Sequence, residues 1–219
     1  MLHGGRAMNR PQEAVQAELV AVAVGVLDGA PRVLTTSASQ LQLPAGPLRE
    51  DHRSMQAGVG GWGGGKTRPG PRDRGEPYVE QLYTFADRDR AGSQRTISVS
   101  YLGLTWLEHG DLERWVSWYD LFPWEDQRDG GALLGALEPH LRAWANAEDS
   151  ERREVRCRVT FGLDGTDWHP ELALQRYEVL YEAGLVPESP DSREALPPQI
   201  VGPWMLHDHR RIVATAMGR

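Results

Sequence analysis

The side chains best suited to binding a charged ligand lie in residues 78–104, which read YVEQLYTFADRDRAGSQRTISVSYLGL. A short acidic and aromatic turn leads into a strand here, and Arg90 and Arg95 lie between the two. A guanidinium suits a diphosphate because its planar fork binds two oxygens at once. The charged run DRDR (87–90) before Gly92 fits a solvated hairpin connection equally well. Both interpretations remain open at this point.

A second candidate is the glycine-rich tract of residues 58–77, GVGGWGGGKTRPGPRDRGEP. Within it, residues 60–67 match the phosphate-loop pattern G-x4-G-K-[ST]. Such a loop needs a buried strand before it and a helix after it, so that backbone amides and the helix N-terminus hold the phosphate. The flanking segments HRSMQA and RPGPRDRGEP provide neither element. In so glycine-rich a tract we expect a chance match and no working phosphate loop.

The chain as a whole has the composition of a globular domain: 219 residues, 40% hydrophobic and 25% charged. A net charge of -7 argues against a nucleic-acid surface over the whole chain. One cysteine, Cys157, excludes an intrachain disulfide and fits a reducing cytoplasm. We expect it to be a small buried side chain, because VRCRVTF alternates like a strand. No apolar run approaches the ~20 residues of a membrane helix, so no membrane partner is expected.

Hydrophobic patterning predicts both strands and helices. Strands are expected at 16–28 and 32–36, joined at a turn by Asp28 and Gly29, and again at 97–104 and 154–161. Helices are expected at 132–147, 170–183 and 206–219, and loops at 41–48 and 187–203. The clearest helix, 170–183, has Pro170 in its first turn, Gly184 after its end, and an apolar stripe formed by Leu174, Tyr177, Leu180 and Tyr181.

Tryptophans are concentrated in residues 111–131. Trp115, Trp118 and Tyr119 fall at helical spacing, and Pro123 interrupts the pattern. Trp106, Trp115, Trp118 and Trp124 could stack on an adenine or nicotinamide ring. Aromatic stripes at this spacing more often belong to a core, and we expect that role here.

The order of residues around the opening motif carries a resemblance to a known family. Glu80, Gln81, Tyr83, Thr84, Phe85, Asp87 and Arg95 lead into Ile97–Leu104. This order resembles the Nudix-fold sensor domains of bacterial regulators of NAD metabolism, over about residues 15–105 and 200–219. The segments FPWEDQRDG and QRYEVLYEAGLV resemble the alphaproteobacterial branch of these NAD regulators.

The resemblance implies an α/β fold with a Nudix-like mixed sheet flanked by helices and a Trp-rich insertion. Residues 1–14 are then a disordered N-terminus, and residues 15–219 are the sensor domain. The insertion spans about 108–200, and 58–77 is a degenerate glycine-rich segment. These regulators continue into a C-terminal winged helix-turn-helix that reads DNA. We expect that DNA-binding domain to be absent, because the chain stops at Arg219.

A Nudix hydrolase needs the signature G-x5-E-x7-R-E-U-x-E-E-x-G-U, where U is aliphatic and the glutamates bind Mg²⁺. Counted from Gly46, the first glutamate position holds His52, and the Arg-Glu and Glu-Glu pairs fall on glycines of the 58–65 segment. No other register restores the cluster, because residues 52–72 contain no Asp or Glu. His207 and His209 are two residues apart, so they do not share a helix face and are not expected to form a zinc site. We therefore expect no catalytic residues, no metal site and no cofactor.

The glycine tract also disfavours a helix at residues 58–77, where a Nudix core has one. Each internal glycine costs ~1 kcal/mol relative to alanine in a helix. One hypothesis is that residues 58–76 are a locally frame-shifted reading of GC-rich DNA, which resequencing of the locus tests.

The function that this resemblance implies is a non-catalytic, nucleotide-sensing domain of a transcriptional regulator of NAD biosynthesis. NAD, ADP-ribose or ATP would be the effector, bound by Phe85, Asp87, Arg90, Arg95 and Tyr101. The sensor is expected to be a homodimer that reaches DNA only through the C-terminal domain. Two alternatives stay open: a Nudix hydrolase acting on a nucleoside diphosphate derivative such as ADP-ribose, and a decayed gene product that folds poorly.

Overall fold

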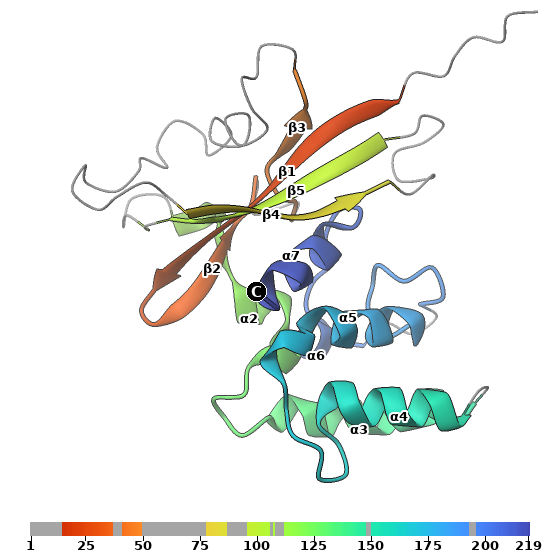
Figure 1. Cartoon of the computed structure of the whole chain (residues 1–219). Helices are drawn as coiled ribbons and strands as arrows, with labels where there is room; N and C mark the ends of the chain where they lie inside the picture. The colour runs from red at the N-terminus through yellow and green to blue at the C-terminus, as the bar shows by residue number, and fades with distance from the viewer. Residues whose placement is uncertain are drawn as a thin grey trace, which may run out of the picture.

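A computed structural model describes residues 15–36, 41–49, 78–86, 96–105, 107, 112–147, 150–192 and 196–219. In Figure 1 a twisted sheet lies on one side of the molecule and the helices are stacked on the other. Several segments discussed above lie outside the described residues: the N-terminus 1–14, the glycine-rich tract, the DRDR run with Gly92 and Arg95, and Trp106.

The sheet has six strands and is mixed. They are β1 (Gln16–Leu27), β2 (Ala30–Leu34), β3 (Ala45–Pro47), β4 (Tyr78–Phe85), β5 (Thr96–Leu104) and β6 (Trp115–Ser117). Their order is β4-β5-β1-β2-β6, and β3 also pairs with β1. The β1–β5 pair is parallel and the other pairs are antiparallel. The predicted class, α/β with a mixed sheet flanked by helices, is confirmed.

The first hairpin forms where the sequence predicts it. Asp28 and Gly29 have φ angles of 51° and 75°, as a two-residue turn with the twist of the flanking strands requires. The turn brings Val24 opposite Val33 in the β1–β2 ladder. The middle of β1 is almost fully buried, which explains why its sequence is a nearly continuous apolar run.

Strand β5 also matches its prediction, since it covers Thr96–Leu104 and alternates between two faces. Val99 and Tyr101 pack with Leu19 on one face of the sheet, whereas Leu102 belongs to the main core on the other face. The turn predicted before it is wrong: residues 78–85 form strand β4, antiparallel to β5 along the edge of the sheet.

The helices form layers below the sheet (Figure 1). α7 (His209–Met217) contacts β1 and β4, α5 (Ala173–Glu182) packs against α7, and α4 (Ser150–Phe161) and α3 (Ala132–Ala145) follow. Short elements complete the chain: η2 (Leu112–Arg114), α2 (Trp118–Leu121), η3 (Pro123–Glu125), η4 (Pro170–Leu172) and α6 (Pro198–Val201). The helices predicted at 132–147, 170–183 and 206–219 are thereby confirmed.

The strand predicted at 154–161 is wrong, because these residues belong to helix α4. The buried positions are Cys157, Thr160 and Phe161, which follow helical spacing. Val155 and Val159, whose alternation with arginine suggested a strand, are 45% and 42% exposed. Cys157 is nevertheless a small buried side chain, as expected.

The tryptophan-rich region departs from the predicted helix. Trp115 starts strand β6 and pairs with Leu34, whereas Trp118 starts α2 and Pro123 starts η3. Trp115 and Trp124 are buried and Trp118 packs against the core, so the expected core role is confirmed for these three. The predicted loops also contain short regular elements, β3 within 41–48 and α6 within 187–203.

Two buried ion pairs hold the helical layers together. The Arg176 and Glu125 side chains are 0% and 5% exposed, and the same values hold for Arg210 and Glu188. Arg210 also donates to the carbonyls of Leu121 and Val201. Among the described residues no helix is long and apolar enough to span a bilayer.

Candidate functional site

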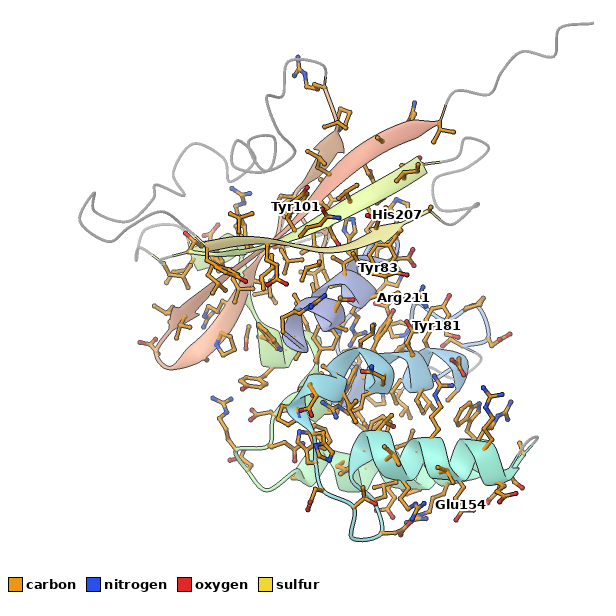
Figure 2. The ribbon with its side chains drawn as sticks, in the orientation of Figure 1. Tyr83, Tyr101, Glu154, Tyr181, His207 and Arg211 are labelled. Atoms are coloured by element: carbon orange, nitrogen blue, oxygen red, sulfur yellow. The ribbon has the colours of Figure 1, made fainter. Side chains whose placement is uncertain are left out.

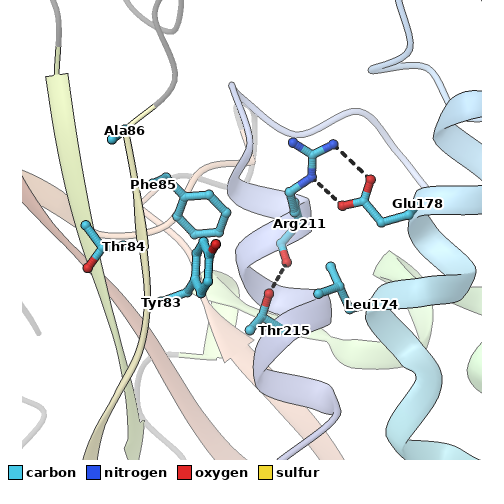
Figure 3. Close-up of a pocket in the computed structure, with 8 residues that line it drawn as sticks. All are labelled: Tyr83, Thr84, Phe85, Ala86, Leu174, Glu178, Arg211 and Thr215. Carbon is cyan, nitrogen blue, oxygen red and sulfur yellow. Dashed lines mark hydrogen bonds and ion pairs between the residues drawn. The ribbon is translucent and has the colours of Figure 1, made fainter.

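A cavity of about 560 Å³ lies between the end of strand β4 and helices α5 and α7 (Figure 3). Its volume falls in the range of small-molecule sites. Three segments far apart in the sequence line it: Tyr83, Thr84, Phe85 and Ala86 from the sheet edge, Leu174 and Glu178 from α5, and Arg211 and Thr215 from α7.

A β-bulge shapes the strand wall of this pocket. The ladder between β4 and β5 shifts register between Gln81 and Thr84. The Ser100 hydroxyl replaces the lost ladder bonds: it accepts from the Tyr83 backbone N–H at 3.2 Å and donates to the Tyr83 carbonyl at 2.8 Å. Because of the extra residue, Leu82 and Phe85, three apart, both reach the main core.

Two aromatic rings project from this wall toward the helices (Figure 3). The rings of Tyr83 and Phe85 meet edge to face, with centroids 5.0 Å apart and an interplanar angle of 65°. Phe85 is buried, whereas Tyr83 is 57% exposed. A tyrosine in this position offers a ring to a planar ligand and a hydroxyl near the helices.

The helix wall is made by residues spaced four apart, which share one face of each helix. Leu174 and Glu178 lie on α5, and Arg211 and Thr215 lie on α7. Arg211 Nε is 2.7 Å from Glu178 Oε1, and Arg211 Nη2 donates to Glu178 Oε2 at 3.1 Å. An ion pair between the two helices therefore forms the charged part of the pocket, as Figure 3 shows.

The guanidinium of Arg211 has further neighbours that fix its charge and position. Its Cζ lies 5.2 Å from the centroid of the Tyr181 ring, and its Nη1 lies 3.8 Å from Asp208 Oδ1. Burial lowers the pKa of Arg211, but the charges of Glu178 and Asp208 outweigh burial and raise it overall. Arg211 thus stays a cation at every physiological pH.

Helix α5 is held in place from its opposite side by Arg176. This side chain donates to both oxygens of Glu125, at 2.7 and 2.8 Å, and its Cζ lies 3.8 Å from the ring centroid of Trp168. It also donates to the carbonyls of Thr160, His169 and Pro170. Since residues 174 and 178 face away from 176 on a helix, this anchor sets the rotation that turns Leu174 and Glu178 toward the pocket.

The ligand residues proposed from the sequence do not all lie at the pocket. Phe85 lines the pocket, whereas Tyr101, labelled in Figure 2, lies on the opposite face of the sheet with Leu19 and Val99. Burial raises the pKa of the Tyr101 hydroxyl. Asp87, Arg90 and Arg95 lie outside the described residues, although Asp87 directly follows the lining residue Ala86.

Sequence reasoning missed the charged pair of the pocket, Arg211 and Glu178. The stripe that marks α5 as a helix includes Leu174, yet it gives no reason to select Glu178, four residues later on the same face. Arg211 stands next to Arg210 in a basic segment, and only the packing of α7 decides which of the two reaches the pocket.

The hydroxyl on the helix wall of the pocket is engaged with the backbone. Thr215 Oγ1 donates to the Arg211 backbone carbonyl at 2.9 Å, and a carbonyl cannot act as a base. No group of three or more His, Cys, Asp or Glu that could hold a metal occurs in the described part of the chain. His209 instead accepts a hydrogen bond from the Leu43 backbone N–H through Nδ1, at 3.0 Å.

Comparison with known proteins gives structural matches only. No family model matches the sequence, and no curated protein matches it. The NUDIX domain of Shewanella oneidensis NrtR complexed with ADP ribose is similar at 24% identity and a TM-score of 0.36, over 47% of this chain and 69% of that one. A structure of Shewanella oneidensis NrtR is similar at 20% identity and a TM-score of 0.37, over 75% of this chain and 76% of that one.

A MutT/nudix family protein from Enterococcus faecalis is similar at 18% identity and a TM-score of 0.33, over 43% of this chain and 38% of that one. All three TM-scores are low, so these superpositions by themselves establish neither an activity nor a ligand for this chain.

Proposed function

We propose that this chain is a Nudix-like nucleotide-sensing domain of a transcriptional regulator of NAD biosynthesis, and that its effector binds in the pocket between β4, α5 and α7. The effector is NAD, ADP-ribose or ATP. The observation that carries the proposal is the pocket itself, in which an exposed tyrosine ring and a partly buried cation face one cavity of nucleotide size. An aromatic ring can stack on a nucleobase, and a guanidinium can donate hydrogen bonds to the edge of that base.

The position of the pocket supports a sensing role. Its walls come from the sheet edge, from α5 and from α7. A ligand that contacts all three segments changes the free energy of their mutual arrangement, which is the requirement for an allosteric response. We propose that the protein acts in the cytoplasm as a homodimer whose arrangement, and hence whose effect on DNA, depends on the bound effector.

Phe85 and the following residues Asp87, Arg90 and Arg95 remain the proposed contacts from the sheet side. Arg90 and Arg95 are proposed to hold the diphosphate, because two guanidinium forks can share its oxygens. Tyr101 has no place in this pocket, because it faces the other side of the sheet.

Equilibrium titration tests the proposal directly. Purified protein is titrated calorimetrically with NAD, ADP-ribose and ATP, and its thermal unfolding is recorded with each. At least one nucleotide is expected to bind and to raise the melting temperature. Arg211→Gln is expected to weaken that binding by at least about tenfold, or ~1.4 kcal/mol. Arg142→Gln is the matched control, because Arg142 lies on α3, outside this pocket, and pairs with Glu138 and Asp164.

The result that overturns the proposal is a folded protein that binds none of the three nucleotides. The same samples test the hydrolase alternative: release of AMP from ADP-ribose in Mg²⁺ at ordinary enzyme rates would replace the sensing function by catalysis. A protein without a cooperative melting transition would support the decayed-gene alternative instead.

A further inference from the structure

The ion pair in the pocket wall places a hydrogen-bond acceptor beside a donor. Arg211 approaches Glu178 through Nε and Nη2 only. Each carboxylate oxygen has a further lone pair, and Arg211 Nη1 is too far from Asp208, at 3.8 Å, for a hydrogen bond. The two side chains are partly open, with 22% and 28% of their surfaces exposed. They can therefore accept and donate to a ligand while remaining paired.

Apolar surfaces flank this acceptor and donor. The Tyr83 ring projects from β4, and Leu174 projects from α5 across the cavity (Figure 3). Tyr83, Thr84 and the helix side chains come from different layers of the fold, so the space between them is a slot between sheet and helices. A flat ring placed in such a slot stacks on the tyrosine and presents its edge to the ion pair.

We propose that this slot binds a purine ring carrying an amino group next to an unprotonated ring nitrogen, the edge that adenine presents. The proposal rests on the nucleotide-sensing function above and names the part of the effector that the pocket recognises. Glu178 accepts from the amino group, Arg211 donates to the ring nitrogen, and Tyr83 stacks on the ring. The carboxylate that contacts the base thus comes from the proposed insertion, because Glu178 belongs to α5.

The positions of the acceptor, Glu178, and the donor, Arg211, make the site selective for adenine over hypoxanthine. Hypoxanthine has the same shape, but it presents a carbonyl where adenine has the amino group and an N–H where adenine has the acceptor. The carbonyl would face the carboxylate of Glu178, and the N–H would face the cation of Arg211. Both contacts are repulsive, and a site built for one hydrogen-bonding edge rejects the reversed one strongly.

A second cavity in the described part of the chain does not offer this chemistry. It lies beside Cys157 on α4 and has a volume of about 50 Å³. That volume suits one or two water molecules and excludes a purine. The slot beside β4 is thus the better candidate of the two.

The test compares two ligands that differ only at this edge, ADP-ribose and inosine diphosphate ribose. Calorimetric titration of the full chain is expected to show at least about a tenfold preference for ADP-ribose. Glu178→Gln is expected to reduce the preference to about threefold or less, because an amide side chain can also donate to the inosine carbonyl. Thermal melting of each variant establishes that it is folded.

Glu182→Gln is the matched control for this variant. Glu182 lies one turn further along α5, outside the pocket, where its Oε1 accepts from Arg156 Nη2 at 2.8 Å. This control is expected to keep the preference of the unmodified chain. If both ligands bind with equal affinity, base reading by Glu178 and Arg211 is refuted while nucleotide sensing stands. If neither ligand binds to the folded protein, base recognition fails, and if NAD and ATP do not bind either, nucleotide sensing fails as well.

Discussion

The buried ion pair between Arg176 and Glu125 gives the sharpest prediction about how the pocket is held in place. Arg176 is fully buried on the side of α5 opposite the pocket, and Glu125 is its only anionic partner in the described structure. The substitution Glu125→Gln keeps the size of the side chain, so it creates no cavity. It removes the charge and leaves the guanidinium in the interior with neutral acceptors only.

The expected cost follows from the burial of both groups. Removing one partner of a buried ion pair costs about 3–5 kcal/mol, because the remaining charge loses its compensation without returning to water. Three carbonyl acceptors and the Trp168 ring still hold Arg176, which favours the lower end of that range. For a chain of this size, 1 kcal/mol shifts the melting temperature by about 2–4 °C. We therefore expect a decrease of about 6–12 °C.

Urea unfolding followed by circular dichroism measures this change in free energy. The control is Glu138→Gln, which removes a carboxylate from an ion pair of similar length, 2.6 Å, on the surface of α3. An exposed pair of this kind contributes about 0.3–0.5 kcal/mol. Because Arg176 sets the rotation of α5, Glu125→Gln is also expected to weaken effector binding more than the control does.

If Glu125→Gln lowers the free energy of unfolding no more than the surface control does, the buried ion pair does not stabilise the fold as predicted. A double-mutant cycle with Arg176→Met separates the pair from other effects. A coupling free energy below about 0.5 kcal/mol, the level found for independent sites, would show that the two side chains do not act together.

Three further predictions concern burial and backbone geometry. Cys157, whose thiol pKa is raised by burial, is expected to resist a thiol reagent at about pH 8 in the native protein and to react rapidly once about 8 M urea unfolds the chain. A DTNB absorbance assay measures both rates, and rapid labelling of the native protein would contradict the buried position of Cys157. Burial, and then the charge of Glu188, raise the pKa of Tyr177 above its unfolded value. The contribution of Tyr177 to stability is therefore complete below about pH 10 and is lost as the pH rises further, by up to ~1.4 kcal/mol per pH unit. Tyr177→Phe should flatten the dependence of the urea-unfolding free energy on pH between about pH 10 and 11, and an unchanged slope would disprove the assignment. Gly202→Ala should lower the melting temperature clearly more than Gly29→Ala does. Both glycines have a positive φ, but only at Gly202 would the added carbon collide with a backbone carbonyl. Equal decreases in melting temperature would contradict the packing around Gly202.

Local patterns explain the elements that the sequence predicted correctly. The β1–β2 hairpin follows from an apolar run and a turn at Asp28 and Gly29, and α5 follows from its apolar stripe and its final glycine. These signals involve residues close together in the chain, whose geometry depends little on the rest of the fold. Residues 154–161 were mistaken for a strand because valines alternating with arginines imitate a period of two. The decisive contacts, of Cys157 and Phe161 with the neighbouring helices, are tertiary.

The amino-acid sequence alone predicts an α/β fold whose clearest helix lies near residues 170–183, and it shows that residues 52–72 lack the carboxylates of a Nudix metal site. It also points to the strand around Phe85 as part of a ligand site. The charged side chains that face this strand come from helices far away in the chain. Glu178 and Arg211 are 33 residues apart in the chain and become partners because α5 and α7 pack side by side. Such a pairing depends on the summed packing of distant elements, which no local spacing of residues records.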